Sequence, residues 1–277
     1  MRLVDIGANL AHDSFDADRE AVLARARAAG VAAMIVTGST LNDSEKAIAL
    51  ARHHPRALRA TAGVHPHHAS SLSESDADQL SALLADPMVV AAGECGLDYF
   101  RNFSPPAAQR RAFELQLDIA SRHDKPLFLH QRDAHADFLA MLRGHPAQAR
   151  RAVLHCFTGG PAELEDCLGL GLSVGIAGWI CDERRGQALR ESASRVPAGR
   201  LMLETDAPYL LPRTLRPKPA HRRNEPAFLP AVLEELARCR GEDPEALAAA
   251  TTDNACQFFG LTLGGAGKGS PDTVELL

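Results

Sequence analysis

Residues 89–98 have the sequence VVAAGECGLD, an apolar run that leads into a carboxylate, Glu94, between two glycines. The run from Val89 to Gly93 has no polar face, which is typical of a parallel strand covered by helices on one side and by a core on the other. The two glycines allow close backbone approach and unusual dihedral angles around the carboxylate. This segment therefore predicts a buried strand with a functional group at its carboxyl end.

Seven further runs share this character, because each is short, rich in Leu or β-branched residues, and apolar on both faces. They span residues 3–6, 34–37, 60–64, 127–129, 152–154, 173–176 and 201–203. Helical patterns separate the runs and predict helices over 16–29, 43–53, 76–85, 105–123, 133–143, 161–170, 184–195 and 226–239. Most strand starts lie about 20–35 residues apart, which is near the length of one βα unit.

Eight βα units in one chain predict an α/β fold of the (β/α)8 TIM barrel type. The alternative is an open, doubly wound sheet. That fold would be expected to carry a G-x-G-x-x-G fingerprint after its first strand, and the residues Gly7-Ala8-Asn9 do not match it. No Pro-rich or Ser-rich linker divides the chain, so we expect one domain over 1–262 and a Gly-rich, disordered tail over 263–277.

The composition agrees with a single large globular domain. The chain has 277 residues, 45% of them hydrophobic and only 5% aromatic, which argues against an all-β sandwich. No apolar run approaches the roughly 18 residues of a membrane span, and no secretory signal is evident at the start. The six cysteines form no Cys-x-x-Cys pair and are typical of a reduced, cytoplasmic protein. A net charge of −5 excludes a globally basic nucleic-acid coat but not a local basic patch.

Polar residues that can bind metal or carry protons follow five of the eight predicted strands. A barrel brings the carboxyl ends of its strands to one mouth, where catalytic groups are found. Each histidine alone is more often structural than functional. Together, buried imidazoles and carboxylates at one mouth are costly unless they are paired or bound to metal, so the set predicts a divalent metal site. The residues are His65, Glu94, His130, His155, and the pair Glu204 and Asp206.

Two carboxylates in this set need a choice between roles. Glu204 and Asp206 are two residues apart and face the same way in an extended strand. Asp206 is nearer the strand end and precedes Ala-Pro, so it is the better candidate for the mouth. Asp98 is interpreted as a loop cap in preference to a partner of the metal ligands.

A local basic segment follows the eighth predicted strand. Residues 207–224 contain no acidic residue and should lie over the mouth, near which barrels often bind phosphate. A solvated loop is the usual explanation of a charge run, but this position favours phosphate binding. Its cations are Arg213, Arg216, Lys218, His221, Arg222 and Arg223, with Arg132, Arg184 and Arg185 as additional candidates.

Aromatic residues also lie in the predicted loops at the strand ends. Stacking on nucleic-acid bases is open to them, although packing is the more common fate of such side chains. They are Tyr99, Phe100, Phe103, Trp179 and Tyr209.

Several sequence motifs appear along the chain in a specific order. They are AGVHPH (62–67), GECGLD (93–98), LHCFTG (154–159), ETDAPYL (204–210) and RNEP (223–226). From residue 1 to about residue 261 the chain thereby resembles the TatD family of metal-dependent deoxyribonucleases. The phrases DERRG (182–186) and Lys218-Pro219 make it most similar to the member that gives the family its name.

The resemblance implies a barrel of the amidohydrolase type that holds a divalent metal, commonly magnesium, with Mn²⁺ or Zn²⁺ as alternatives. It implies metal ligation by Glu94, His130 and His155, and it matches Asp206 to the family aspartate of strand eight. One departure is the absence of a His-x-His pair after the first strand, where Gly7 and Asn9 stand. Two ligands of a second metal are therefore missing, which favours either a single-metal site or a second ion that arrives only with the substrate phosphate.

The resemblance also implies 3′-to-5′ removal of nucleotides from single-stranded DNA and also RNA, with a role in DNA repair. We expect Asp206 to orient or deprotonate water or to bind the metal, and His65 to contact the scissile phosphate or the leaving oxygen. The expected enzyme is a cytoplasmic monomer without a membrane partner. Two alternatives remain open: an ester-cleaving deacylase of mischarged tRNA, such as a D-aminoacyl-tRNA deacylase, and an inactive barrel that serves as a binding partner.

Overall fold

The eight predicted apolar runs form one parallel sheet in which consecutive strands are neighbours. The computed structural model describes residues 1–264 and 274–276. The strands are β1 (Leu3–Ala8), β2 (Val31–Val36), β3 (Leu58–Ala62), β4 (Val89–Asp98), β5 (Leu127–Arg132), β6 (Ala152–Leu154), β7 (Ser173–Ile176) and β8 (Leu201–Leu203). The predicted bounds of β6, β7 and β8 are confirmed to the residue. β4 and β5 run further than predicted, because they continue to pair with each other as far as Asp98 and Arg132.

The segment that follows β8 joins β1 and nearly closes the sheet into a barrel. Ala8 and Ala207 form a parallel bridge. The Asp206 N–H donates to the carbonyl of Gly7 at 2.8 Å, and the Asn9 N–H donates to the carbonyl of Ala207 at 2.7 Å. The predicted TIM barrel is therefore confirmed, and its closure lies next to the predicted functional residue of strand eight.

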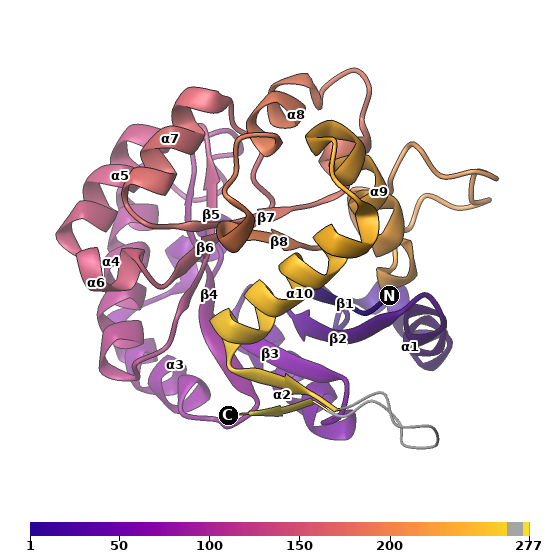
Figure 1. Cartoon of the computed structure of the whole chain (residues 1–277). Coiled ribbons are helices and arrows are strands. Elements are labelled where there is room, and N and C mark those ends of the chain that lie inside the picture. Colours follow the sequence, from indigo (N-terminus) through magenta and orange to yellow (C-terminus); the bar gives the residue numbers. More distant parts are fainter. Residues whose placement is uncertain (265–273, 277) are drawn as a thin grey trace.

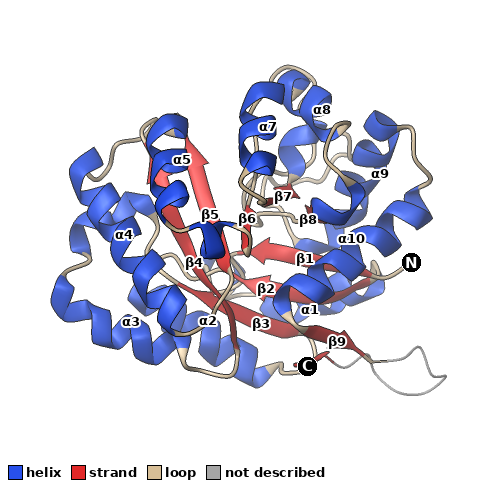
Figure 2. Cartoon of the chain, turned by 60° about the vertical axis from the view of Figure 1, so that its left-hand side comes forward, coloured by secondary structure: helices blue, strands red, loops and turns tan. Residues whose placement is uncertain are grey.

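Helices surround the strands and alternate with them along the chain (Figures 1 and 2). They are α1 (Arg19–Ala28), α2 (Leu41–His53), α3 (Ala77–Leu84), α4 (Pro106–Arg122), α5 (His135–Gly144), α6 (Pro146–Ala149), α7 (Pro161–Gly169), α8 (Gln187–Ala193), α9 (Leu229–Arg240) and α10 (Pro244–Phe259). Short 3-10 turns connect them: η1 (Asp13–Phe15), η2 (Pro66–Ser71), η3 (Glu74–Asp76), η4 (Gly178–Cys181), η5 (Ala198–Arg200) and η6 (Pro226–Phe228). All eight predicted helices are present, and the structure adds α6 and α10.

Helix α10 lies across the ring of strands (Figure 1) and fills the amino-terminal end of the barrel. Its residues Ala255 and Phe259 pack against Val4, Ile6 and Met202, which point into the barrel interior. Side chains alternate along a strand, so the residues between these inward ones face the surrounding helices instead. The amino-terminal end of the barrel interior is thus filled by apolar side chains, and the polar strand-end residues lie at the opposite mouth.

Residues Leu261–Leu263 (β9) pair in antiparallel fashion with Val274–Leu276 (β10). The sequence predicts a disordered tail at residue 263 and residues 274–276, but the structure places them in this small sheet. Of the rest of that predicted tail, residue 264 is described and lies outside the sheet, and residues 265–273 and 277 lie outside the described residues. Within the described part of the chain, no helix has the length and apolar character that crossing a membrane requires.

Candidate active site

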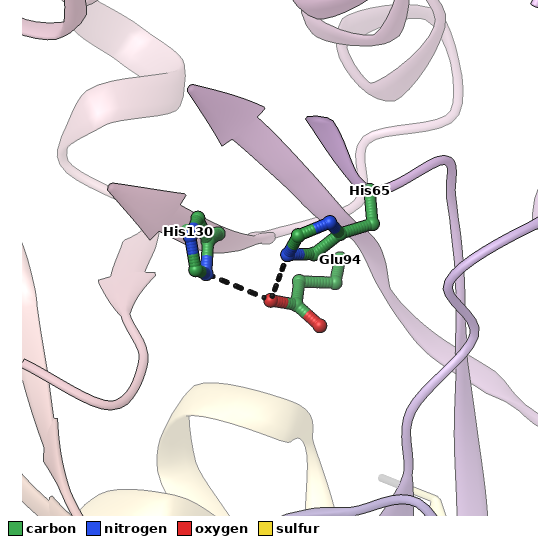
Figure 3. Close-up of side chains that lie close together, drawn as sticks. All are labelled: His65, Glu94 and His130. Atoms are coloured by element: carbon green, nitrogen blue, oxygen red, sulfur yellow. Dashed lines mark ion pairs between the residues drawn. The ribbon is translucent and has the colours of Figure 1, made fainter. Parts of the chain in front are cut away.

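A carboxylate oxygen of Glu94 lies among three imidazole rings at the mouth of the barrel. Glu94 Oε1 is 3.2 Å from Nε2 of His65, 3.1 Å from Nδ1 of His130 and 2.8 Å from Nε2 of His155. Figure 3 shows the first two of these contacts, with both rings turned toward the same oxygen. Four consecutive strands, β3 to β6, therefore deliver their strand-end residues to one point, as the barrel prediction required.

Glycines allow the strands around Glu94 to approach closely. A Cβ atom at Gly93, which has φ of +140°, would lie 2.1 Å from the carbonyl oxygen of Phe128 on β5. A Cβ at Gly63 would lie 2.6 Å from the backbone of Gly93. Larger residues at these positions would push β3, β4 and β5 apart and would separate the ligand atoms that the strands carry.

Glu204 holds His155 from below. Its Oε2 is 3.1 Å from Nδ1 of His155, while its Oε1 accepts the backbone N–H of Cys156. The Glu204 side chain is fully buried, and Cβ atoms at Gly7 and Gly175 would each lie 2.4 Å from its oxygens. A histidine whose second nitrogen is held by a carboxylate presents its other nitrogen in a defined orientation. Of the two carboxylates that are two residues apart, Glu204 therefore lies beneath the mouth.

Asp206 follows β8 and lies at the same mouth. Its Oδ1 accepts a hydrogen bond from Nδ2 of Asn9 at 3.2 Å, and its backbone has φ of +54°. Asn9 stands at one of the two positions where the family resemblance implied a histidine. The structure thus uses this side chain to orient the carboxylate of Asp206.

Asp98 acts both as a loop cap and as a partner of the histidines. Its Oδ1 accepts the N–H of Arg101 at 2.8 Å, as expected of a cap. Its Oδ2 lies 2.8 Å from Nε2 of His67 and 3.3 Å from Nε2 of His130. Asp98 therefore fixes the ring whose other nitrogen, Nδ1, faces Glu94.

The charges at this site favour a cation. Burial opposes the charged forms of Glu94 and His155, but the attraction between their opposite charges outweighs the cost of burial. The pKa of Glu94 is therefore held well below its usual value. For the same reason the pKa of His155, between Glu94 and Glu204, is raised well above its usual value. Burial lowers the pKa of His65 to about 4 and raises the pKa of Asp206 to about 7. Positive charge is stabilised between these carboxylates, and a divalent cation would displace the proton of His155.

The donor atoms fit such a cation. One atom each from His65, Glu94 and His130 lies within 4.8 Å of the others. Imidazole nitrogen and carboxylate oxygen are ligands for Zn²⁺, Mn²⁺ and related ions. The structure thus groups His65 with two predicted metal ligands, although the predicted role of His65 is contact with the substrate.

The basic segment after β8 is partly neutralised by carboxylates. Arg213 makes two contacts with Glu183, at 2.9 and 2.7 Å, and Arg223 makes two with Asp18, both at 2.7 Å. Such two-point pairs occupy the fork that would otherwise bind phosphate. The segment also contains exposed cationic residues, namely Arg216, Lys218 and Arg222, together with exposed His221.

Sequence reasoning missed two residues that contact the site. His67 lies two positions after His65, and Asn9 was noted only as a departure from the family pattern. The His-x-His of residues 65–67 was a usable signal for the first. No local signal pointed to Asn9, because its contact with Asp206 spans 197 positions of the chain.

Known proteins resemble this chain in sequence and in fold. The family model described as TatD related DNase matches residues 4–260. A protein of Erwinia amylovora named 3′-5′ ssDNA/RNA exonuclease TatD is 53% identical over 94% of this chain and all of its own length. A protein of the same name from Citrobacter rodentium is 54% identical over 94% of this chain and 99% of its own length.

Solved structures agree with these matches. A TatD homologue from Escherichia coli superimposes with a TM-score of 0.85 and 30% identity, covering 93% of this chain and 98% of its own. A phosphotriesterase homology protein from Escherichia coli, solved with phosphate in its active site, has a TM-score of 0.67 at 15% identity, covering 93% and 98%. The latter likeness establishes only the shared barrel fold.

Proposed function

The chain belongs to the family of TatD-related DNases, and on this premise we propose that it is a metal-dependent 3′-to-5′ exonuclease of single-stranded DNA and RNA. The observation that carries the proposal is the oxygen of Glu94 that faces the imidazoles of His65, His130 and His155. The reaction, the substrate and the polarity are supported by the names of the similar proteins. The physiological role would be DNA repair or nucleic-acid turnover.

Glu94, His130, His155 and Asp206 are the proposed ligands, and His65 joins them because its Nε2 is 3.2 Å from Glu94 Oε1. A divalent cation bound there would supply Lewis acidity toward water and would neutralise phosphate charge. We favour Mg²⁺ from the family resemblance, with Mn²⁺ and Zn²⁺ as alternatives. One resident cation is proposed.

The chain's own residues then perform three tasks. Asn9 donates to Oδ1 of Asp206, and Oδ2, which has no hydrogen-bond partner among the described residues, would accept the proton of the attacking water. Glu204 and Asp98 hold the rings of His155 and His130 in fixed orientations. Preorganisation of this kind reduces the cost of reaching the reacting geometry.

A degradation assay tests the proposal. Single-stranded DNA labelled at either end is incubated with Mg²⁺, Mn²⁺ or EDTA, beside His155→Ala and the control His145→Ala. His145 contacts Glu114 at 2.8 Å on the outside of the barrel and is not part of the site. We expect metal-dependent shortening from the 3′ end that is lost in His155→Ala and retained in His145→Ala. Full activity in His155→Ala, or activity insensitive to EDTA, would refute the assignment.

A monomer in the cytoplasm is proposed, and the six free cysteine thiols support a reducing compartment. No particular feature of the site favours the deacylase alternative. The assembled carboxylates and imidazoles argue against an inactive barrel, because buried ionisable groups without a function would destabilise the fold.

A further inference from the structure

Two phenylalanines on the loop between β4 and α4 project into solvent beside the mouth. Phe103 is 68% exposed and Phe100 is 53% exposed. Large apolar side chains are usually buried, and exposed ones that gather at a site mark a binding surface. The exposure of both side chains makes this loop a candidate binding surface.

The loop that presents Phe103 is firmly tied to the barrel. Ser104, the next residue, is buried, and its Oγ donates to the carbonyl of His67 at 3.0 Å and accepts the N–H of Ser70 at 3.0 Å. Gln109 Nε2 donates to the carbonyl of Ser104 at 2.8 Å. The exposure of Phe103 is thus a fixed feature of the loop and is not caused by loose packing.

A series of ring contacts connects Phe103 to the proposed metal ligands. The ring centroids of Phe103 and His67 are 4.8 Å apart, and those of His67 and His65 are 4.2 Å apart. The ring centroids of His65 and His130 are 4.5 Å apart. One ring, that of His67, therefore lies between Phe103 and the proposed ligand His65. A nucleotide bound with its phosphate at the ligands would have its base within reach of this phenyl face.

The second phenylalanine carries a cation. The guanidinium of Arg132 lies 4.0 Å from the centre of the Phe100 ring, and that of Arg101 lies 5.6 Å from it. Arg132 follows the ligand His130 by two residues. Over the described residues neither arginine forms an ion pair with a carboxylate, in contrast to Arg213 and Arg223. The β4–β5 side of the mouth thus combines available positive charge with apolar ring faces.

We propose that Phe103, Phe100 and Arg132 form a stacking platform for the bases of the single strand whose phosphate is cleaved. The proposal deepens the proposed function and rests on it. Aromatic faces and guanidinium planes stack on unpaired bases of any sequence. A duplex keeps its base faces covered, so this platform accounts for action on single strands by a chain with net negative charge.

The test measures both binding and turnover. Binding of a fluorescein-labelled oligothymidylate is followed by anisotropy in EDTA, and its degradation is followed with Mg²⁺. A second oligonucleotide carries abasic tetrahydrofuran units at its two 3′-terminal positions. Wild type is compared with Phe103→Ala, Phe100→Ala and the conservative Phe103→Tyr, and Tyr209→Ala serves as the comparator from the β8 side of the mouth.

Stacking of one base on an aromatic residue strengthens binding by about 5- to 150-fold. We expect Phe103→Ala and Phe100→Ala to raise the Kd and KM for the natural oligonucleotide within this range, with kcat nearly unchanged. Phe103→Tyr should retain wild-type affinity. Abasic ends should weaken binding to wild type but cost little in Phe103→Ala, because the stacking partner is already absent.

The platform would be overturned if Kd and KM for Phe103→Ala and Phe100→Ala stayed within twofold of wild type. It would also be overturned if abasic ends weakened binding equally in wild type and Phe103→Ala. A loss of affinity confined to Tyr209→Ala would overturn it as well. Failure of the proposed function gives a different outcome. In that case wild type would not shorten either oligonucleotide with any metal, while the anisotropy measurement in EDTA would still support or refute stacking.

Discussion

Replacing Glu204 by Gln tests whether the buried carboxylate beneath the site controls the metal. The substitution keeps the shape of the side chain but changes one oxygen acceptor into an NH₂ donor. Two donors, Nδ1–H of His155 and the backbone N–H of Cys156, face Glu204. One of them must lose its acceptor in the variant, and if that one is His155, the orientation of its metal-binding nitrogen is no longer fixed.

The size of the effect follows from this geometry. Removing the partner of a metal-ligating histidine costs about 10- to 100-fold in metal affinity or activity, which corresponds to about 1.4–2.8 kcal/mol. The unpaired buried donor also lowers the free energy of unfolding by about 1–3 kcal/mol. The fold should survive, because native proteins commonly have about 5–15 kcal/mol of stability in total.

The assay is a calorimetric titration with Mn²⁺, together with the rate of 3′-end shortening at saturating metal. The matched control is Glu20→Gln, which changes a carboxylate 3.1 Å from Nε2 of His54 in a pair whose glutamate is exposed. An exposed pair contributes about 0–1 kcal/mol to stability, so this control should leave metal affinity and rate unchanged. Metal affinity and rate within twofold of wild type in Glu204→Gln would refute the orienting role.

Three further predictions concern neighbouring features. Gly7→Ala would place a Cβ 2.4 Å from Glu204 Oε2, so it should lower the free energy of unfolding by about 1–3 kcal/mol. The control Gly144→Ala, which has open space around the new Cβ, should not lower it. Equal urea midpoints for the two variants would contradict this reasoning. His65→Ala should weaken Mn²⁺ binding in calorimetry if His65 is a ligand, whereas unchanged binding with a raised KM would return it to the substrate role. Burial raises the pKa of Asp5 to about 7, so stability from its protonated form is present below the unfolded pKa near 4 and is lost as pH rises through 7. The free energy of unfolding of the wild type should therefore fall between pH 4.5 and 7.5, and Asp5→Asn should reduce this fall by up to about 4 kcal/mol. Urea unfolding in EDTA measures it. An unchanged slope would show that Asp5 is not the titrating group.

The strands and the residues at their ends could be predicted from local sequence. β6, β7 and β8 match their predicted bounds, because a buried parallel strand leaves a short run that is apolar on both faces. Helix α10 was missed, although Asp243 caps its start and Gly260, with φ of +64°, ends it. Its packing surface is the open end of the barrel, which exists only after the strands have assembled.

By itself, the sequence determined the strand order of the candidate ligands and the chemistry of their side chains, since both are local properties of the chain. Only the tertiary structure decided which groups meet. It brought His65 and His130 to the same oxygen of Glu94, filled the space beside Gly7 with Glu204, and paired Arg223 with Asp18 across 205 positions. The physical reason is that contacts between distant residues depend on how closely the whole barrel packs, which no short window of sequence encodes.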